Sequence, residues 1–175
     1  ETDAAALDVD GGRIDRVPWF DASGAPPSVG DHLRIAGAGP ADLDHGVDRF
    51  VLLARALGSR PEGASAAWRW LGDDGTDVPP AVAFDLAHTG VGVTWDDGTD
   101  LPTALAEVDV LVLTGRRRPP DRLLRTAAAA GTWIVEVACP PGDVRWCGTD
   151  ARAVARGDDL DEVVALILAG AAHRS

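Results

Sequence analysis

The sequence predicts an α/β domain: a Rossmann-like, three-layer αβα arrangement around a mostly parallel sheet. A strand–helix–strand order is visible between Asp31 and Gly75. Strand patterns then continue to alternate with helix-length segments, as crossover connections between parallel strands require. The nearly continuous apolar run from Val108 to Thr114 suits a sheet that is covered on both faces. A chain of 175 residues is large enough for one domain with its own core.

Residues 1–30 differ from the rest and are expected to be a lead-in segment, with residues 31–175 forming the Rossmann-like domain. Alternating apolar residues on both sides of Asp10-Gly11-Gly12 predict a hairpin, and a Pro/Gly/Ser-rich linker follows over residues 21–30. Because the chain starts at Glu1 and contains no Met, we expect a longer parent protein or a processed form.

The strand–helix–strand unit consists of strands over residues 32–36 and 67–71 and a helix over residues 43–57. Apolar residues of this helix recur at three- and four-residue spacing, which predicts an amphipathic helix capped by Asp42 or Asp44. Small, flexible residues follow both strands. Since open α/β sheets place ligands outside the carboxyl ends of their strands, the loops after these strands are the first candidates for a site.

The remaining elements follow in the same alternation. Pro80 opens a helix where its missing N–H costs little, Gly131 ends another helix in the C′ position, and Asp158 or Asp159 caps the last helix. In chain order we predict a helix over 80–88, a strand over 91–95, a helix over 101–107, a strand over 108–114, a helix from 119 to 131, strands over 133–138 and 151–155, and a helix over 160–171.

Net charge argues against two classes of partner. The formal charge is −12 and the pI is near 4.5, whereas nucleic acids and anionic membranes both select basic surfaces. No stretch approaches the ~20 apolar residues of a membrane span, and no signal-peptide pattern opens the chain. We therefore expect a soluble, cytoplasmic protein without a nucleic-acid partner.

The cysteines and histidines do not predict a metal site or a cofactor. Cys139 and Cys147 belong to no CxxC pair, and the four histidines are scattered along the chain, whereas a zinc site needs about four clustered ligands. A reduced pair of cysteines is the expectation, and a disulfide between them is the alternative.

The order of motifs resembles that of a known family. The chain contains Ile35-Ala-Gly-Ala-Gly39, Trp70-Leu-Gly-Asp-Asp-Gly75, Glu107-Val-Asp-Val-Leu-Val-Leu-Thr-Gly115 and Ala127-Ala-Ala-Ala-Gly131. From about residue 32 to 171, this order resembles the C-terminal, donor-binding domain of GT-B glycosyltransferases of the retaining, family-4 type. The resemblance implies a site for a nucleotide-diphosphate sugar and, in an active enzyme, an acceptor-binding N-terminal domain that this chain lacks.

This sequence departs from the family pattern at the residues that bind the donor in the family. The lysine that meets donor phosphate in the family is matched by His45, which is mostly uncharged at neutral pH. The two glutamates of the family's Glu-x7-Glu segment fall near Arg117 or Arg118 and on Thr126. Thr126 could keep one hydrogen bond to a ribose, but it cannot accept from two hydroxyls as a carboxylate does. The resemblance therefore implies a degenerate donor site and an isolated chain without transferase activity.

Each candidate ligand contact also has a purely structural interpretation. Gly37 and Gly39 could bring backbone amides to a pyrophosphate, or could serve only a tight turn. His45 could touch phosphate, or could be a surface or capping residue. Arg116, Arg117 and Arg118 could clamp a diphosphate bidentately, or could pair with the chain's own carboxylates or face solvent.

The loops after the second and third strands offer further candidates. Asp73 and Asp74 could line the site, but Asp-Asp-Gly is also ordinary turn chemistry. Trp95 could stack on a base, and Asp96 opens the loop that corresponds to the family's base-binding segment; a plain turn is the alternative. Trp68 and Trp70 alternate onto one sheet face and are expected in the core.

Three functions remain open from the sequence. The first is a glycosyltransferase-like pseudoenzyme, a non-catalytic or accessory module of a larger protein that contacts a protein partner. The second is the donor-binding half of an active retaining glycosyltransferase. The third is a Rossmann-like binder of another nucleotide, which would use the same glycines and arginines.

Overall fold

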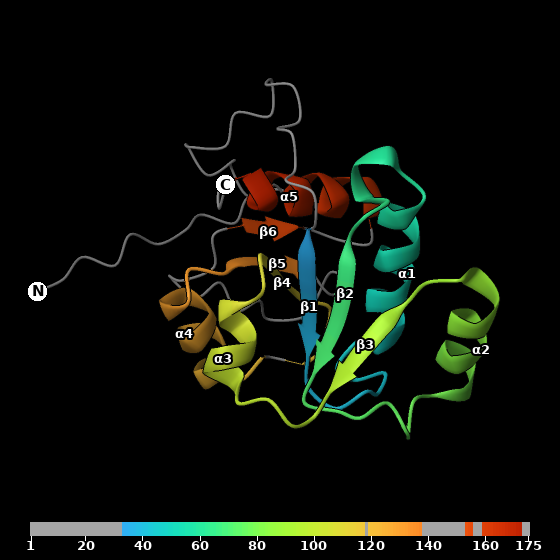
Figure 1. Ribbon diagram of the computed structural model, residues 1–175, viewed down its shortest axis with the longest axis horizontal. Helices are drawn as coiled ribbons and strands as arrows, with labels where there is room; N and C mark the ends of the chain where they lie inside the picture. The colour runs from blue at the N-terminus through green and yellow to red at the C-terminus, as the bar shows by residue number, and fades with distance from the viewer. Residues whose placement is uncertain (1–32, 118, 138–152, 156–158, 173–175) are drawn as a thin grey trace, which may run out of the picture.

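The computed structural model describes residues 33–117, 119–137, 153–155 and 159–172 (Figure 1). The predicted lead-in, Arg118, Cys139 and Cys147 lie outside these residues. In chain order the elements are β1 (Arg34–Ala38), α1 (Val47–Gly58), the short 3-10 helix η1 (Pro61–Gly63), β2 (Ala67–Leu71), α2 (Pro80–Thr89), β3 (Val93–Asp96), α3 (Leu101–Ala106), β4 (Val110–Leu113), α4 (Asp121–Ala129), β5 (Trp133–Val137), β6 (Ala153–Ala155) and α5 (Leu160–Ala172).

Within the described residues, six strands form one parallel sheet in the order β3-β2-β1-β4-β5-β6. Ile35 of β1 lies beside Trp68 of β2 on one side and beside Val110 of β4 on the other. The connections run outward in one direction from β1 to β3 and in the other direction from β4, so the strand order reverses between β1 and β4. The predicted Rossmann-like sheet is confirmed, and this reversal is the topological switch point of the fold.

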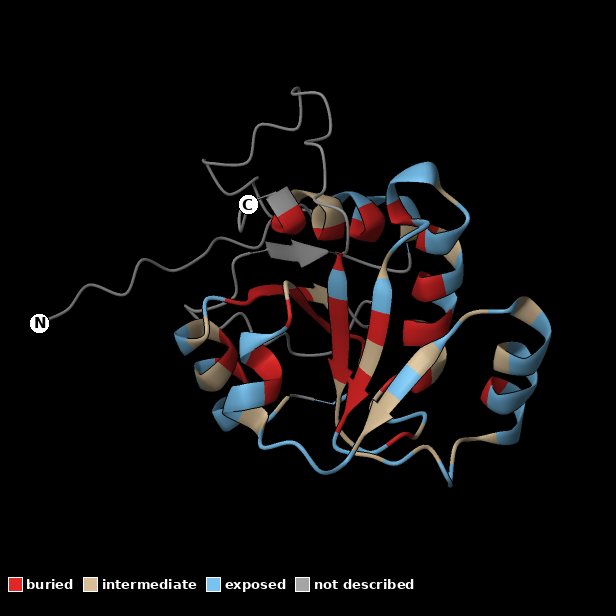
Figure 2. Cartoon of the chain, viewed as in Figure 1, coloured by how far each residue is buried: buried red, intermediate tan, exposed pale blue. Residues whose placement is uncertain are grey.

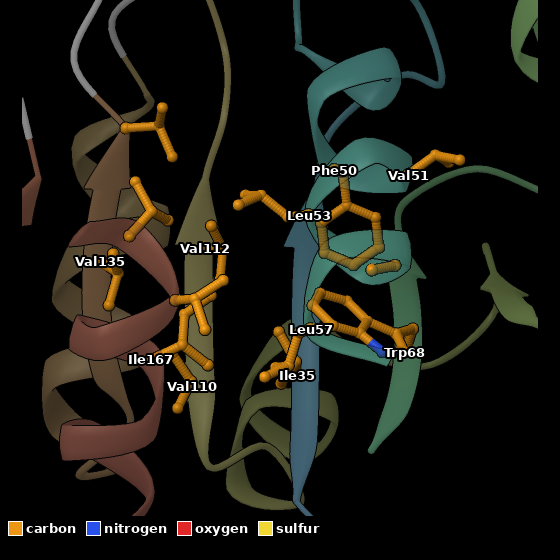
Figure 3. Close-up of a cluster of buried hydrophobic side chains, with 14 of the residues drawn as sticks. Ile35, Phe50, Val51, Leu53, Leu57, Trp68, Val110, Val112, Val135 and Ile167 are labelled. Atoms are coloured by element: carbon orange, nitrogen blue, oxygen red, sulfur yellow. The ribbon is translucent and has the colours of Figure 1, made fainter. Parts of the chain in front are cut away.

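Helices cover both faces of the sheet, which makes the three predicted layers. One core cluster joins α1 and α5 to one face, and Figure 3 shows Phe50, Leu57 and Ile167 of these helices pointing at Trp68 and Val112 of the sheet. A second cluster joins α3 and α4 to the opposite face. Figure 2 shows that the buried residues concentrate in the central strands and on the inward sides of the helices. Covering on both faces explains why β4 is buried at every position.

Most predicted elements are confirmed within a few residues, and β2 has the predicted bounds. Trp68 and Trp70 both lie in the cluster under α1, as predicted from their alternation. Gly131 follows α4 with a left-handed φ of 71°, and the carboxylate of Asp159 accepts hydrogen bonds from the first turn of α5. These two helix ends are the ones that the sequence predicts.

The predicted start of α1 is wrong. The helix begins at Val47 instead of residue 43, and its N-cap is Gly46, which has a φ of 79° and no side-chain cap. The carboxylate of Asp42 instead accepts from the backbone N–H of His45, at 2.8 Å, and so closes a turn before the helix. A short Asp side chain often bonds its own neighbouring backbone in this way, and that alternative competes with capping.

Within the described part of the chain, no helix is long and apolar enough to cross a bilayer. Groups of three or more His, Cys, Asp or Glu side chains that could hold a metal ion are also not found among these residues.

Candidate functional site

The candidate site lies where the carboxyl ends of β1 and β4 meet at the switch point. The carboxyl ends of β1, β2 and β3 point to the lower edge of the sheet in Figure 1. Residues 39–46 connect β1 to α1, and residues 114–120 connect β4 to α4. The backbone N–H of Arg116 donates to the carbonyl of Asp44 at 2.8 Å, so the two loops are in direct contact.

Gly37 and Gly39 are both explained by packing in the turn after β1. A Cβ at Gly37 would lie 2.4 Å from the ring of Trp70. Gly39 has a φ of 119°, and a Cβ there would lie 2.9 Å from the ring of His45. The carbonyl of Gly39 accepts a hydrogen bond from Nε1 of Trp70 at 2.6 Å. These contacts support the turn interpretation; contact of either glycine with a phosphate stays a prediction.

His45 lies in the loop before α1 and pairs with a carboxylate of the same loop. Its Nδ1 is 2.7 Å from Oδ1 of Asp42. Desolvation raises the pKa of Asp42, but the hydrogen bonds from the backbone and side chain of His45 outweigh it and leave that pKa below its ordinary value. Asp42 is therefore ionised at neutral pH, and its carboxylate is held by the backbone and the imidazole of His45.

Arg116 and Arg117, which follow β4, are paired with carboxylates of the facing helix and loop. Arg116 forms a fork with Asp48, with distances of 3.0 and 2.8 Å from its Nη1 and Nη2 atoms to the two carboxylate oxygens. The same guanidinium also donates to the carbonyl of Leu43. Arg117 lies 2.5 Å from the carboxylate of Asp44. Of the interpretations open from the sequence, pairing with the chain's own acids is the one that the structure shows for Arg116 and Arg117.

This pairing changes the electrostatics of the α1 N-terminus. The hydrogen bond from Arg116 is the main reason why the pKa of Asp48 lies below its ordinary value, so this carboxylate is ionised at neutral pH. Asp48 sits in the first turn of α1, where the helix dipole favours a negative charge. A side-chain carboxylate therefore already receives the stabilisation that the helix dipole and Arg116 offer to an anion.

Close backbone packing joins the same two loops. A Cβ at Gly46 would lie 2.1 Å from the carbonyl oxygen of Thr114, which leaves room only for glycine. The hydroxyl of Thr114, which is 1% exposed, donates to the carbonyl of Gly46 at 2.8 Å. Sequence reasoning missed Gly46, Asp48 and Thr114. No local signal could have paired them, because Thr114 and Gly46 are 68 positions apart.

The loop after β2 is braced by its own aspartates. Asp73 accepts from the backbone N–H of Ala41 at 2.9 Å and from that of Gly75 at 2.8 Å, so it also ties this loop to the β1–α1 loop. Asp74 accepts from the backbone and hydroxyl of Thr76. Both carboxylates thus have turn-stabilising roles, and contact with a ligand remains a prediction for them.

The loop after β3 is likewise stabilised by its own aspartate, Asp96. The hydrogen bond from the Thr99 backbone N–H outweighs desolvation and, together with the ion pair to Arg69, holds the pKa of Asp96 below its ordinary value. Trp95 is partly buried and packs on Gly75, where a Cβ would lie 2.6 Å from the indole. The structure gives Trp95 a packing role, and its stacking on a base stays a prediction.

Thr126 lies on α4 and does not belong to these loops. Its hydroxyl donates to the backbone carbonyl of Arg122, one turn earlier in the same helix, at 2.8 Å. The structure therefore brings together Gly39, His45, Asp73, Arg116 and Arg117 around the β1–α1 loop and leaves Thr126 on a neighbouring helix.

Sequence comparison and structure comparison give different results. No protein-family model matches the sequence, and no curated protein matches it. Among solved structures, TarM superposes with a TM-score of 0.64 at 11% identity, over 88% of this chain and 31% of TarM. The catalytic domain of cholesterol-α-glucosyltransferase from Helicobacter pylori superposes with a TM-score of 0.60 at 16% identity, over 79% of this chain and 85% of that one.

WaaG, a glycosyltransferase of lipopolysaccharide biosynthesis, superposes with a TM-score of 0.54 at 16% identity, over 82% of this chain and 42% of WaaG. At such identities the likeness concerns the fold. This chain has a GT-B-like Rossmann fold, and it spans less than half the length of TarM and WaaG.

Proposed function

We propose that this chain is a glycosyltransferase-like domain with a degenerate nucleotide-sugar site, which serves as a non-catalytic module of a larger protein. The GT-B-like fold supports the proposal of a glycosyltransferase-like domain. The pairing of Arg116 with Asp48 supports the degenerate nucleotide-sugar site, and it is the observation that carries the proposal.

The physical argument concerns the cost of admitting a diphosphate. Bidentate arginine–carboxylate pairs are among the stronger hydrogen-bonded contacts, and an incoming phosphate would have to replace the one at Arg116. A phosphate that remained about 4 Å from the Asp48 carboxylate would be repelled by ~1 kcal/mol per pair of unit charges in water and by ~4 kcal/mol at an effective dielectric of 20.

A second candidate is the donor-binding half of an active retaining glycosyltransferase. The structure of a variant of S. aureus TarM contains UDP, and another superposed structure is a UDP-forming α,α-trehalose-phosphate synthase from Burkholderia xenovorans. The position of Arg116 and Arg117 at the switch point favours this candidate. It requires the donor to displace Asp48, and it requires an acceptor domain from outside this chain. A binder of another nucleotide would use the same arginines.

Isothermal titration with UDP, GDP, ADP, UDP-glucose and GDP-mannose separates these functions. We expect no saturable heat at millimolar ligand. The test variant is Arg116→Ala, and the matched control is Arg55→Ala, which removes an exposed arginine from the last turn of α1.

Micromolar binding that Arg116→Ala abolishes and Arg55→Ala retains would refute the degenerate site. If the binding is to UDP, GDP or their sugars, it would establish the donor half, and if it is to ADP alone, it would establish a binder of another nucleotide.

A further inference from the structure

The β4–α4 loop contacts the β1–α1 loop and the first turn of α1 through more than one ion pair. We call this the inter-loop contact and define it by four interactions. They are the Arg116 fork to Asp48, the Arg116 backbone N–H to the carbonyl of Asp44, the Arg117 pair with Asp44, and the Thr114 hydroxyl to the carbonyl of Gly46.

The position of the inter-loop contact matters because ligands of open α/β sheets bind outside the carboxyl ends of the strands that flank the switch point. Here the loops that follow the two flanking strands, β1 and β4, are hydrogen-bonded to each other at this point. Gly46 and Thr114 pack so closely that even a methyl group on Gly46 would meet the Thr114 carbonyl.

The strength of the inter-loop contact is unevenly distributed. The Arg117–Asp44 pair is exposed, with 71% and 51% of the two side chains accessible, and pairs of this kind contribute little. The Arg116–Asp48 pair is more enclosed, at 38% and 31%, and it has two parallel hydrogen bonds. Removing the Asp48 carboxylate should therefore loosen the contact and release Arg116 from its bidentate pair.

We propose that the inter-loop contact is autoinhibitory: the Asp48 carboxylate holds Arg116 and keeps the switch point closed to a diphosphate. This inference rests on the proposed function and explains why the site is degenerate. Neutralising Asp48 removes the carboxylate fork from Arg116, which keeps its hydrogen bond to the carbonyl of Leu43, and removes one of the charges that repel phosphate. The ligand class that the opened site takes is a diphosphate anion, free or as part of a nucleotide.

The test is titration of Asp48→Asn with UDP and with inorganic pyrophosphate. We expect binding at least about tenfold tighter than that of the wild type, a change worth ~1.4 kcal/mol. Asp85→Asn, an exposed site on α2, controls for the rise in net charge and should bind no better than the wild type. Adding Arg116→Gln to Asp48→Asn should abolish the gain. Asp48→Ser replaces Asp48→Asn if the latter does not fold, as judged by near-UV circular dichroism.

Two negative outcomes have different meanings. If the wild type and Asp48→Asn are both silent, the autoinhibitory role is overturned while the degenerate site stands. If the wild type already binds UDP in the micromolar range and Asp48→Asn binds no better, both proposals fail. Binding of UDP but not pyrophosphate by Asp48→Asn supports the inference and shows that the nucleoside is also contacted.

Discussion

Replacing Gly46 by alanine tests whether the inter-loop contact is built as described. Gly46 has a left-handed φ of 79°, a conformation that costs an L-residue about 1–2 kcal/mol. The new Cβ would also lie 2.1 Å from the backbone oxygen of Thr114 and force the two loops apart. Losing the hydrogen bond of the buried Thr114 hydroxyl costs about 1–3 kcal/mol more. We therefore expect Gly46→Ala to lower the free energy of unfolding by about 2–5 kcal/mol.

Urea unfolding provides the measurement, with fluorescence of the six tryptophans and far-UV circular dichroism as probes. Gly58→Ala is the matched control on the same helix, because nothing lies within 4 Å of a Cβ there. Since it only removes glycine's backbone freedom, it should be neutral or stabilising by up to about 1 kcal/mol. If Gly46→Ala is as stable as Gly58→Ala, the close approach of Gly46 to Thr114 is not as described and the reasoning fails.

Two further predictions concern charge and packing. Hydrogen bonding from Arg116 lowers the pKa of Asp48, so its stabilisation is complete above the unfolded-state pKa of about 3.9 and is lost as pH falls through the folded-state pKa. Asp48→Asn should therefore flatten the fall in unfolding free energy below about pH 5, and an unchanged pH profile would contradict the assigned pairing. Phe50 is fully buried and packs edge-on against Trp68 and Trp70, with ring centroids 5.2 and 5.1 Å apart. Phe50→Ala should therefore lower the free energy of unfolding, measured by urea titration, by about 3–5 kcal/mol. Phe84→Ala, at a side chain that is 62% exposed, should stay within about 0.5 kcal/mol, and similar losses in both variants would argue against the described core.

The sequence by itself determined the class of the fold and most of its elements. The alternation of β2 predicted both its bounds and the burial of Trp68 and Trp70 on one face. Gly131 marked the end of α4 because only a residue tolerant of a left-handed conformation fits there. These signals are local: they depend on periodicity and on backbone preferences within a few residues, which a sequence displays directly.

Only the tertiary structure decided the state of the candidate site. From the sequence, Arg116 could bind either a diphosphate or a carboxylate of the chain itself, and its partner Asp48 is 68 positions away. The strand order places β4 beside β1, and this brings the loop of Arg116 against the first turn of α1. The start of α1 was mispredicted for a related reason, since Gly46 adopts its conformation where the Thr114 backbone packs on it. Ion pairs and close backbone contacts between distant segments depend on how the strands are ordered, and neither periodicity nor composition carries that information.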